Sequence, residues 1–123
     1  MANTIKTTFN SILIEQKSKF ISLLIPLEER DQFKTILEDL RKEYKGATHF
    51  CYAMKFKGYA KCDDDGEPKG TAGHPILRIL ETKDMDCCIL VVIRYFGGKK
   101  LGAGKLLRTY VKAAADVVNA AME

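Results

Sequence analysis

An acidic, glycine-rich stretch of the chain, residues 63–73, carries residue types that can hold a cation. Carboxylate oxygens are the usual ligands of hard cations such as Mg²⁺, but the spacing is not that of an EF-hand loop. A turn whose aspartates accept hydrogen bonds from nearby backbone amides accounts for the same residues, so we expect no metal ion here. This stretch is called the acidic segment, and its candidate binding residues are Asp64, Asp65, Gly66, Glu67, Thr71 and Gly73.

A second stretch, residues 94–105, combines glycines with basic side chains and is called the glycine-rich segment. It follows an apolar run and opens a helical pattern, where free backbone amides and the helix dipole favour anions. A Walker A loop does not fit because Leu106 stands at the Ser/Thr position, and a dinucleotide fingerprint fails at Leu107. We therefore expect phosphate contact without a cofactor. The candidate binding residues are Arg94, Tyr95, Gly97, Gly98, Lys100, Gly102 and Gly104.

The positive charge of the chain is concentrated at its C-terminal end. Of the 20 basic and 16 acidic residues, six basic and two acidic ones fall within residues 94–123, so residues 1–93 carry 14 of each and are neutral. Such asymmetry indicates an anionic partner, although a helix face that is simply solvated has the same appearance. The residues expected to contact an anion or nucleic acid are Lys99, Lys100, Lys105, Arg108 and Lys112.

Residues for covalent or acid–base catalysis are scarce, and none is assigned as catalytic. His49 and His74 have no nucleophile beside them in the sequence, and each is typical of a packing or capping residue. Tyr95 and Phe96 can stack on bases, but aromatic residues at the end of a buried strand more often belong to the core. The four cysteines form no CxxC pair, which favours reduced, mostly buried thiols over disulfides or zinc ligands.

Hydrophobic periodicity predicts the elements that position these segments. Apolar spacing is typical of a long helix in residues 28–44, a short one beginning near Pro75, and a third after the glycine-rich segment. Helices and strands in this order predict an α+β two-layer sandwich, a mixed β-sheet with its helices on one face. Neither a signal peptide nor an apolar run of membrane-spanning length is present, which predicts a cytoplasmic protein. The expected strands are residues 5–14, 18–25, 48–56, with a turn at 57–60, and 87–93.

Two long strings of residues resemble a known family. DDGEPKGTAGHPIL (residues 64–77) and VVIRYFGGKKLGAGKLLRTY (residues 91–110) are similar to the signature of the Impact N-terminal family, which includes the bacterial YigZ-like proteins. The shorter strings KSKFIS (17–22) and ATHFCYA (47–53) also resemble family positions. The resemblance therefore extends over nearly the whole chain.

The resemblance implies a fold like that of the second domain of a small-subunit ribosomal protein and of domain IV of elongation factor G, with a left-handed β-α-β crossover. Proteins of this fold often contact RNA, and the eukaryotic namesake regulates translation by interfering with a kinase that responds to uncharged tRNA. Gly104 and Lys105 stand where the family has two glycines, which makes this segment more basic. Many bacterial members carry a second, ferredoxin-like domain; we expect a single domain in residues 1–123.

Three functions remain open from the sequence. The first is a non-enzymatic binding module that contacts RNA, the ribosome or a translation factor and is linked to translation regulation. The second is a protein-interaction regulator without direct RNA contact. The third is an enzyme for a phosphorylated substrate, which requires the acidic and glycine-rich segments to converge on one cleft.

Overall fold

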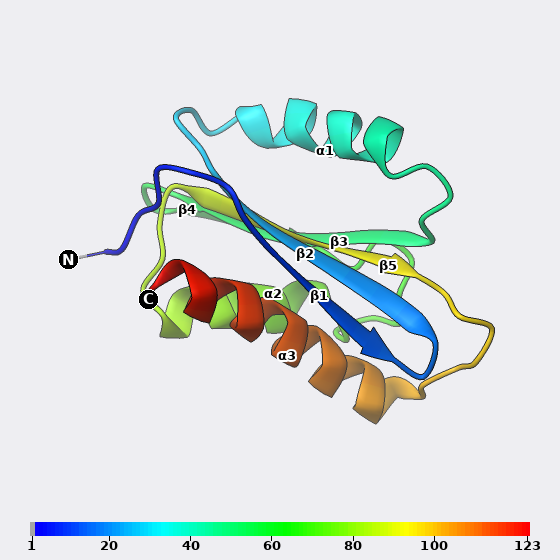
Figure 1. The fold of residues 1–123 in the computed structure, drawn as a ribbon. Coiled ribbons are helices and arrows are strands. Elements are labelled where there is room, and N and C mark those ends of the chain that lie inside the picture. The colour runs from blue at the N-terminus through cyan, green and yellow to red at the C-terminus, as the bar shows by residue number, and fades with distance from the viewer. Residues whose placement is uncertain (1) are drawn as a thin grey trace.

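The structure, a computed structural model, describes residues 2–123. Within them lie five strands and three helices, one strand more than the sequence pattern predicts (Figure 1). The additional strand is the second arm of the predicted hairpin, whose two turn residues, Lys57 and Gly58, both have positive φ as a tight hairpin requires. In chain order the elements are β1 (Phe9–Glu15), β2 (Ser18–Pro26), α1 (Gln32–Glu43), β3 (His49–Phe56), β4 (Tyr59–Asp63), α2 (Gly73–Thr82), β5 (Cys88–Tyr95) and α3 (Ala103–Ala121).

The strands form one sheet in the order β1-β2-β5-β3-β4, and every pair of neighbours is antiparallel. The α+β class is thereby confirmed, but the sheet is not mixed as predicted. The reason lies in the connections through α1 and α2, each of which passes over one strand of the sheet. β2 and β3 run parallel with β5 between them, and β4 and β5 run parallel with β3 between them. Parallel strands are therefore present but are never hydrogen-bonded neighbours.

Helices cover both faces of the sheet, so the prediction of helices on one face is wrong. α1 lies on one face, and α2 and α3 lie together on the other (Figure 1). The central strand β5 explains this arrangement because it is fully buried along most of its length. Leu90 and Val92 face the α2–α3 side, whereas Ile89 and Val91 face α1. A strand that is apolar on both sides needs cover on both sides.

The two helical crossovers have opposite hands. The connection from β2 to β3 skips one strand, and so does the connection from β4 to β5. The two connections cross the sheet in opposite directions. The strands that they join also point in opposite directions. Rotating the sheet by half a turn about the axis perpendicular to it therefore places the strands of one connection on those of the other. Because α1 and α2 lie on opposite faces, one crossover is right-handed and the other is left-handed, against the usual right-handed rule. The left-handed crossover expected from the family resemblance is thus present.

The core on the α2–α3 side is built around Tyr110 and Phe20, whose rings meet edge to face at 5.3 Å. The buried stripe of α3 begins at Leu106, whereas the next residue, Leu107, is 39% exposed. All four cysteines are free thiols; Cys51 and Cys88 are buried, whereas Cys62 and Cys87 are partly exposed, so the thiols are not mostly buried as predicted. Among residues 2–123, every helix is too short or too polar to span a bilayer.

Strand register brings the two segments singled out in the sequence to the same end of the sheet. Arg94, near the end of β5, lies between Phe20 on β2 and His49 at the start of β3. The chain then passes through the glycine-rich segment into α3, whose first turn lies near the β1–β2 turn (Figure 1). The acidic segment reaches this end from β4.

Candidate functional site

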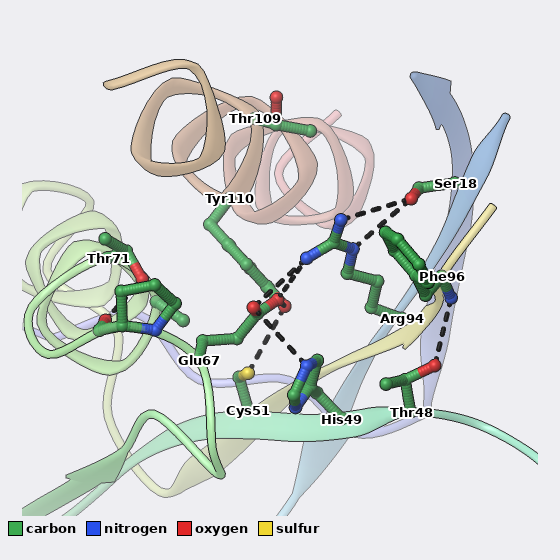
Figure 2. Close-up of polar contacts among 12 residues, drawn as sticks. Ser18, Thr48, His49, Cys51, Glu67, Thr71, Arg94, Phe96, Thr109 and Tyr110 are labelled. Carbon is green, nitrogen blue, oxygen red and sulfur yellow. Dashed lines mark hydrogen bonds and ion pairs between the residues drawn. The ribbon is translucent and has the colours of Figure 1, made fainter. Parts of the chain in front are cut away.

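Glu67, in the acidic segment, is the centre of a buried polar network (Figure 2). Its carboxylate accepts hydrogen bonds from Arg94 Nη1 at 2.8 and 3.1 Å and from the Tyr110 hydroxyl. His49 Nε2 lies 3.4 Å from the same carboxylate. The side chain is only 3% exposed, so this one residue ties the acidic segment to β3, β5 and α3.

Arg94 is held from both sides as well as by Glu67. Its Nε and Nη2 donate to Ser18 Oγ at 3.4 and 3.2 Å, and its guanidinium lies over the rings of Phe20 and Phe96 at 5.4 and 5.5 Å. A buried ion pair loses hydration of both charges, and only well-placed hydrogen bonds offset that loss. Here Ser18 and the two oxygens of Glu67 accept these hydrogen bonds. The Glu67–Arg94 ion pair therefore fixes the positions of both side chains.

Asp64 is occupied by backbone amides. It accepts hydrogen bonds from the N–H groups of Gly70 at 2.9 Å, Ala72 at 3.1 Å and Gly73 at 2.7 Å. Burial by itself would raise the pKa of Asp64, but these three donors stabilise the carboxylate and the pKa is lowered. Gly73 must be glycine, because a Cβ there would lie 2.9 Å from the Asp63 backbone. Asp64 thus holds the acidic segment against the start of α2.

Asp65 is also satisfied by its neighbours. Its carboxylate accepts the Phe50 N–H at 2.7 Å and pairs with Arg41 at 3.0 Å. Its carbonyl accepts a hydrogen bond from His49 Nδ1 at 2.7 Å, so that nitrogen carries the hydrogen and Nε2 faces Glu67. Gly66 has a φ of 86° and lies against the His49 ring. The Asp65 carbonyl therefore orients the imidazole ring through Nδ1.

The acidic segment also has hydrogen bonds within itself, besides those of Asp65 and Glu67 to other elements. Thr71 Oγ1 donates to the Pro68 carbonyl at 2.5 Å, within the segment. Residues 2–123 contain no group of three or more His, Cys, Asp or Glu side chains placed to hold a metal ion. The interpretation of the segment as a turn with internal hydrogen bonds agrees with the geometry of Asp64.

The glycine-rich segment is fixed by its backbone. Gly97 N–H donates to Ser18 Oγ at 3.2 Å, and a Cβ on Gly97 would lie 2.2 Å from the carbonyl of Lys17. Gly98 and Gly102 have φ of 87° and 82° with open space around them, so they serve the path of the chain. Gly104 is an ordinary residue of the first turn of α3, where a Cβ would meet Arg108 at 3.4 Å.

The two aromatic residues at the end of β5 point in opposite directions. Tyr95 packs with the α1-side core and takes no part in the site. Phe96 is 47% exposed and stands beside Arg94 (Figure 2). Its backbone N–H donates to Thr48 Oγ1 at 3.0 Å. The general expectation that such aromatics are core holds for Tyr95 and fails for Phe96.

The two segments converge on a pocket of about 390 Å³. The buried Glu67–Arg94 pair lies at its base, and the start of α3 forms one wall. The other lining residues are partly apolar and partly polar, with Thr48 and His49 among the polar ones, and Phe96 and Lys100 are exposed. The residues that line it are Thr48, His49, Glu67, Pro68, Arg94, Phe96, Lys100, Leu101, Gly102, Ala103 and Leu106.

The basic residues predicted to contact an anion differ in their surroundings. Lys105 pairs with Glu15 at 2.8 Å, and Lys112 pairs with Asp116 at 3.4 Å. Within residues 2–123, no ion pair involves Lys99, Lys100 or Arg108, and all three are exposed.

Only Lys100 of this set lines the pocket between the two segments. Lys105, Arg108 and Lys112 line a separate, shallower hollow beside β1 of about 360 Å³. The predicted contacts therefore divide between two neighbouring surfaces.

Several site residues were not singled out as binding residues from the sequence. Ser18 lies in a predicted strand and Tyr110 in the predicted buried face of a helix. The hydrogen bonds of both side chains depend on partners far along the chain. Thr48 and His49 lie in the family-like string ATHFCYA, but that string does not tell what their side chains contact. Phe96 was noticeable as an aromatic residue within the glycine-rich segment. Its type and position do not tell, however, which way its ring points.

The buried polar groups favour a structural role over chemistry. Burial strongly raises the pKa of the Cys51 thiol and of the Tyr110 hydroxyl, so neither ionises easily. Cys51 Sγ lies 3.1 Å from the Asp64 carbonyl and 3.3 Å from the Tyr110 hydroxyl. These contacts rigidify the base of the pocket.

The domain has a five-stranded antiparallel sheet and two crossovers of opposite hand. A pocket lies between two loops at one end of this sheet. Together these features define a distinct kind of α+β domain. The chain belongs to the Impact N-terminal domain family, which it matches over residues 16–118. It is 36% identical over 119 residues to the IMPACT family member YvyE of Bacillus subtilis, an alignment that covers 94% of this chain and 55% of that protein.

Solved structures agree with this assignment. The crystal structure of a hypothetical protein, 30% identical, matches with a TM-score of 0.90 over 94% of this chain and 59% of that one. The two-domain translational regulator Yih1, 23% identical, matches with a TM-score of 0.59 over 98% of this chain and 49% of its own, and shows likeness of fold alone. The chain spans about half the length of the bacterial relatives that it matches.

Proposed function

We propose that this domain is a non-enzymatic, cytoplasmic binding module that contacts RNA, free or in the ribosome, and takes part in translation regulation. The observation that carries the proposal is the contrast in charge around the pocket. The carboxylates of Asp64, Asp65 and Glu67 in the acidic segment are engaged by internal donors, whereas Lys99 and Lys100 of the glycine-rich segment are exposed without an ion pair among residues 2–123. An uncompensated positive surface favours a polyanion.

The comparisons support the link to translation. Relatives of the chain carry the name IMPACT, and the structural neighbour Yih1 is described as a translational regulator. Arg108 extends the basic surface along α3 beyond Lys100. Phosphate contacts by such side chains position a nucleic acid without reading its sequence, which suits a partner recognised by shape.

Binding to ribosomes, tRNA and a generic RNA duplex across a salt series tests the proposal. We expect affinity to fall steeply with salt, since each neutralised phosphate releases counterions, and we expect Lys100→Glu to lower it. Lys42→Glu is the matched control, because Lys42 is an exposed lysine of α1 on the opposite face of the sheet. Equal affinity of the two variants for RNA would refute the proposal.

A second candidate is a protein-interaction regulator, favoured by an open groove of about 630 Å³ between α2 and α3. Leu77, Leu107 and Val111 line its apolar part, and Leu107 is 39% exposed. Pull-down from lysate with nuclease treatment separates the two candidates. A partner retained after RNA removal and lost in Leu107→Ser would favour the groove, whereas retention that depends on RNA would favour the basic surface.

A further inference from the structure

We propose that the pocket receives one unpaired nucleobase of a single-stranded RNA, stacked on Phe96, while Lys100 contacts the adjacent phosphate. This inference rests on the proposed RNA contact and names the form of RNA that the site selects.

Phe96 is an exposed aromatic residue that contacts the buried Arg94 side chain. It is 47% exposed although it directly follows the buried strand β5. Its backbone N–H donates to Thr48, and its ring lies 5.5 Å from the Arg94 guanidinium, which is itself fixed by Glu67 and Ser18 (Figure 2). The ring therefore lies beside Arg94 and still presents exposed surface on which a flat ring can stack.

The rest of the pocket suits a flat, largely apolar group with a polar edge. Its volume of about 390 Å³ falls in the range typical of small-ligand sites, roughly 300–1,000 Å³. Pro68, Leu101 and Leu106 supply apolar walls. The Thr48 hydroxyl oxygen accepts from the Phe96 N–H, so its hydrogen remains able to donate to an acceptor on a base edge.

The charge of the pocket favours an anion beside that flat group. Glu67 brings a negative charge, but Arg94 neutralises it through two hydrogen bonds. Lys100 then contributes a net positive charge at the exposed side. A flat ring next to an anion is the chemistry of a nucleotide.

A base within a duplex is stacked and paired on both sides and cannot enter such a pocket without being extruded. A single strand offers unpaired bases at no such cost. The pocket therefore predicts a preference for single-stranded over double-stranded RNA, which the basic surface alone does not.

The test compares a labelled single-stranded RNA with a duplex of the same sequence by fluorescence anisotropy, at one fixed salt concentration. We expect the wild-type chain to bind the single strand roughly tenfold more tightly than the duplex, in line with one stacked base. Phe96→Ala should lose roughly that factor for the single strand and leave the duplex unchanged. Phe96→Tyr should retain it, and Lys100→Glu should weaken both ligands.

Tyr59→Ala is the matched control, since Tyr59 is a 38% exposed aromatic residue on the distant β3–β4 hairpin. Equal wild-type affinity for both RNAs, with both lost in Lys100→Glu, would overturn the base pocket and leave RNA contact standing. Failure to bind either RNA would overturn both proposals.

A second measurement reports on the pocket directly. Adenosine 5′-monophosphate is titrated into ¹⁵N-labelled protein, and the backbone amide shifts are followed. Saturable shifts at Phe96, Leu101 and Ala103, absent in Phe96→Ala, are the expected result. Shifts confined to residues outside the pocket, or none at all, would overturn the inference.

Discussion

The acidic and glycine-rich segments stand side by side, yet they use their charged side chains in opposite ways. Asp64, Asp65 and Glu67 direct their carboxylates inward, to backbone amides, arginines and a tyrosine. The glycine-rich segment directs its backbone inward through Gly97 and its Arg94 side chain inward to Glu67, but it leaves Lys99 and Lys100 exposed. The acidic charges and Arg94 therefore build the site, and Lys99 and Lys100 are available to a partner. A charged residue in the sequence is known to be available to a binding partner only after its hydrogen bonds and ion pairs within the protein are assigned.

This contrast predicts that acidic-segment variants lose stability, whereas variants of the exposed lysines change binding. The largest loss is expected for Glu67→Gln, which leaves Arg94 buried without a counter-charge. Breaking a buried ion pair by removing one partner should lower the free energy of unfolding by about 4 kcal/mol. Urea unfolding measures this loss. Glu38→Gln, at an exposed position of α1, is the control and should change stability by less than about 0.5 kcal/mol.

Two adjacent glycines provide a comparison within the glycine-rich segment. Gly97→Ala should cost about 3 kcal/mol, because the new Cβ meets the Lys17 backbone at 2.2 Å and overpacking of this kind displaces the chain. Gly98→Ala should cost about 1 kcal/mol, since it has open space and only its positive φ is strained. Thermal or urea unfolding of the pair measures both values. Equal costs would show that the contact with Lys17 is relaxed in solution.

A smaller effect on stability concerns acid sensitivity. The pKa of Asp64 is lowered in the folded chain from its ordinary 3.8, as three backbone donors outweigh the effect of burial. Its contribution to stability is therefore complete above the ordinary value and is lost as the pH falls through the lowered folded value. Asp64→Asn should reduce this acid-dependent loss, measured by urea unfolding at a series of pH values below about 5. Asp39→Asn, at an exposed site on α1, should leave the profile unchanged.

The smallest effect on stability is expected at Lys100. Lys100→Glu should change the free energy of unfolding by less than about 0.5 kcal/mol, because the side chain is exposed and has no ion pair among the described residues. Its effect should appear in RNA binding, where the slope of log affinity against log salt should fall by about one. A stability loss comparable to that of Glu67→Gln would erase the distinction between the two segments.

Much of the fold follows from periodicity, because burial leaves a repeating mark on nearby residues. The helices in residues 32–43 and 103–121 and the buried strand 88–95 are visible in this way. β4 is not, since all but one of its residues are exposed and it lacks an apolar pattern. The unbroken apolar run of β5 indicates that both faces of the sheet are covered. The order of the strands has no such mark in the sequence. Strand order depends on pairings between distant segments, which no local window contains.

The sequence by itself determined the family, the main elements, the free thiols and the location of excess positive charge. Tertiary structure alone decided which charges are internal. Glu67 and Arg94 are 27 residues apart, and Ser18 and Arg94 are 76 apart, so neither contact leaves a local signature. Burial of apolar residues within helices and strands follows mainly from residue type and spacing, and the sequence records that pattern. Hydrogen bonding of a buried polar group is a property of a pair, and only the folded chain brings the pair together.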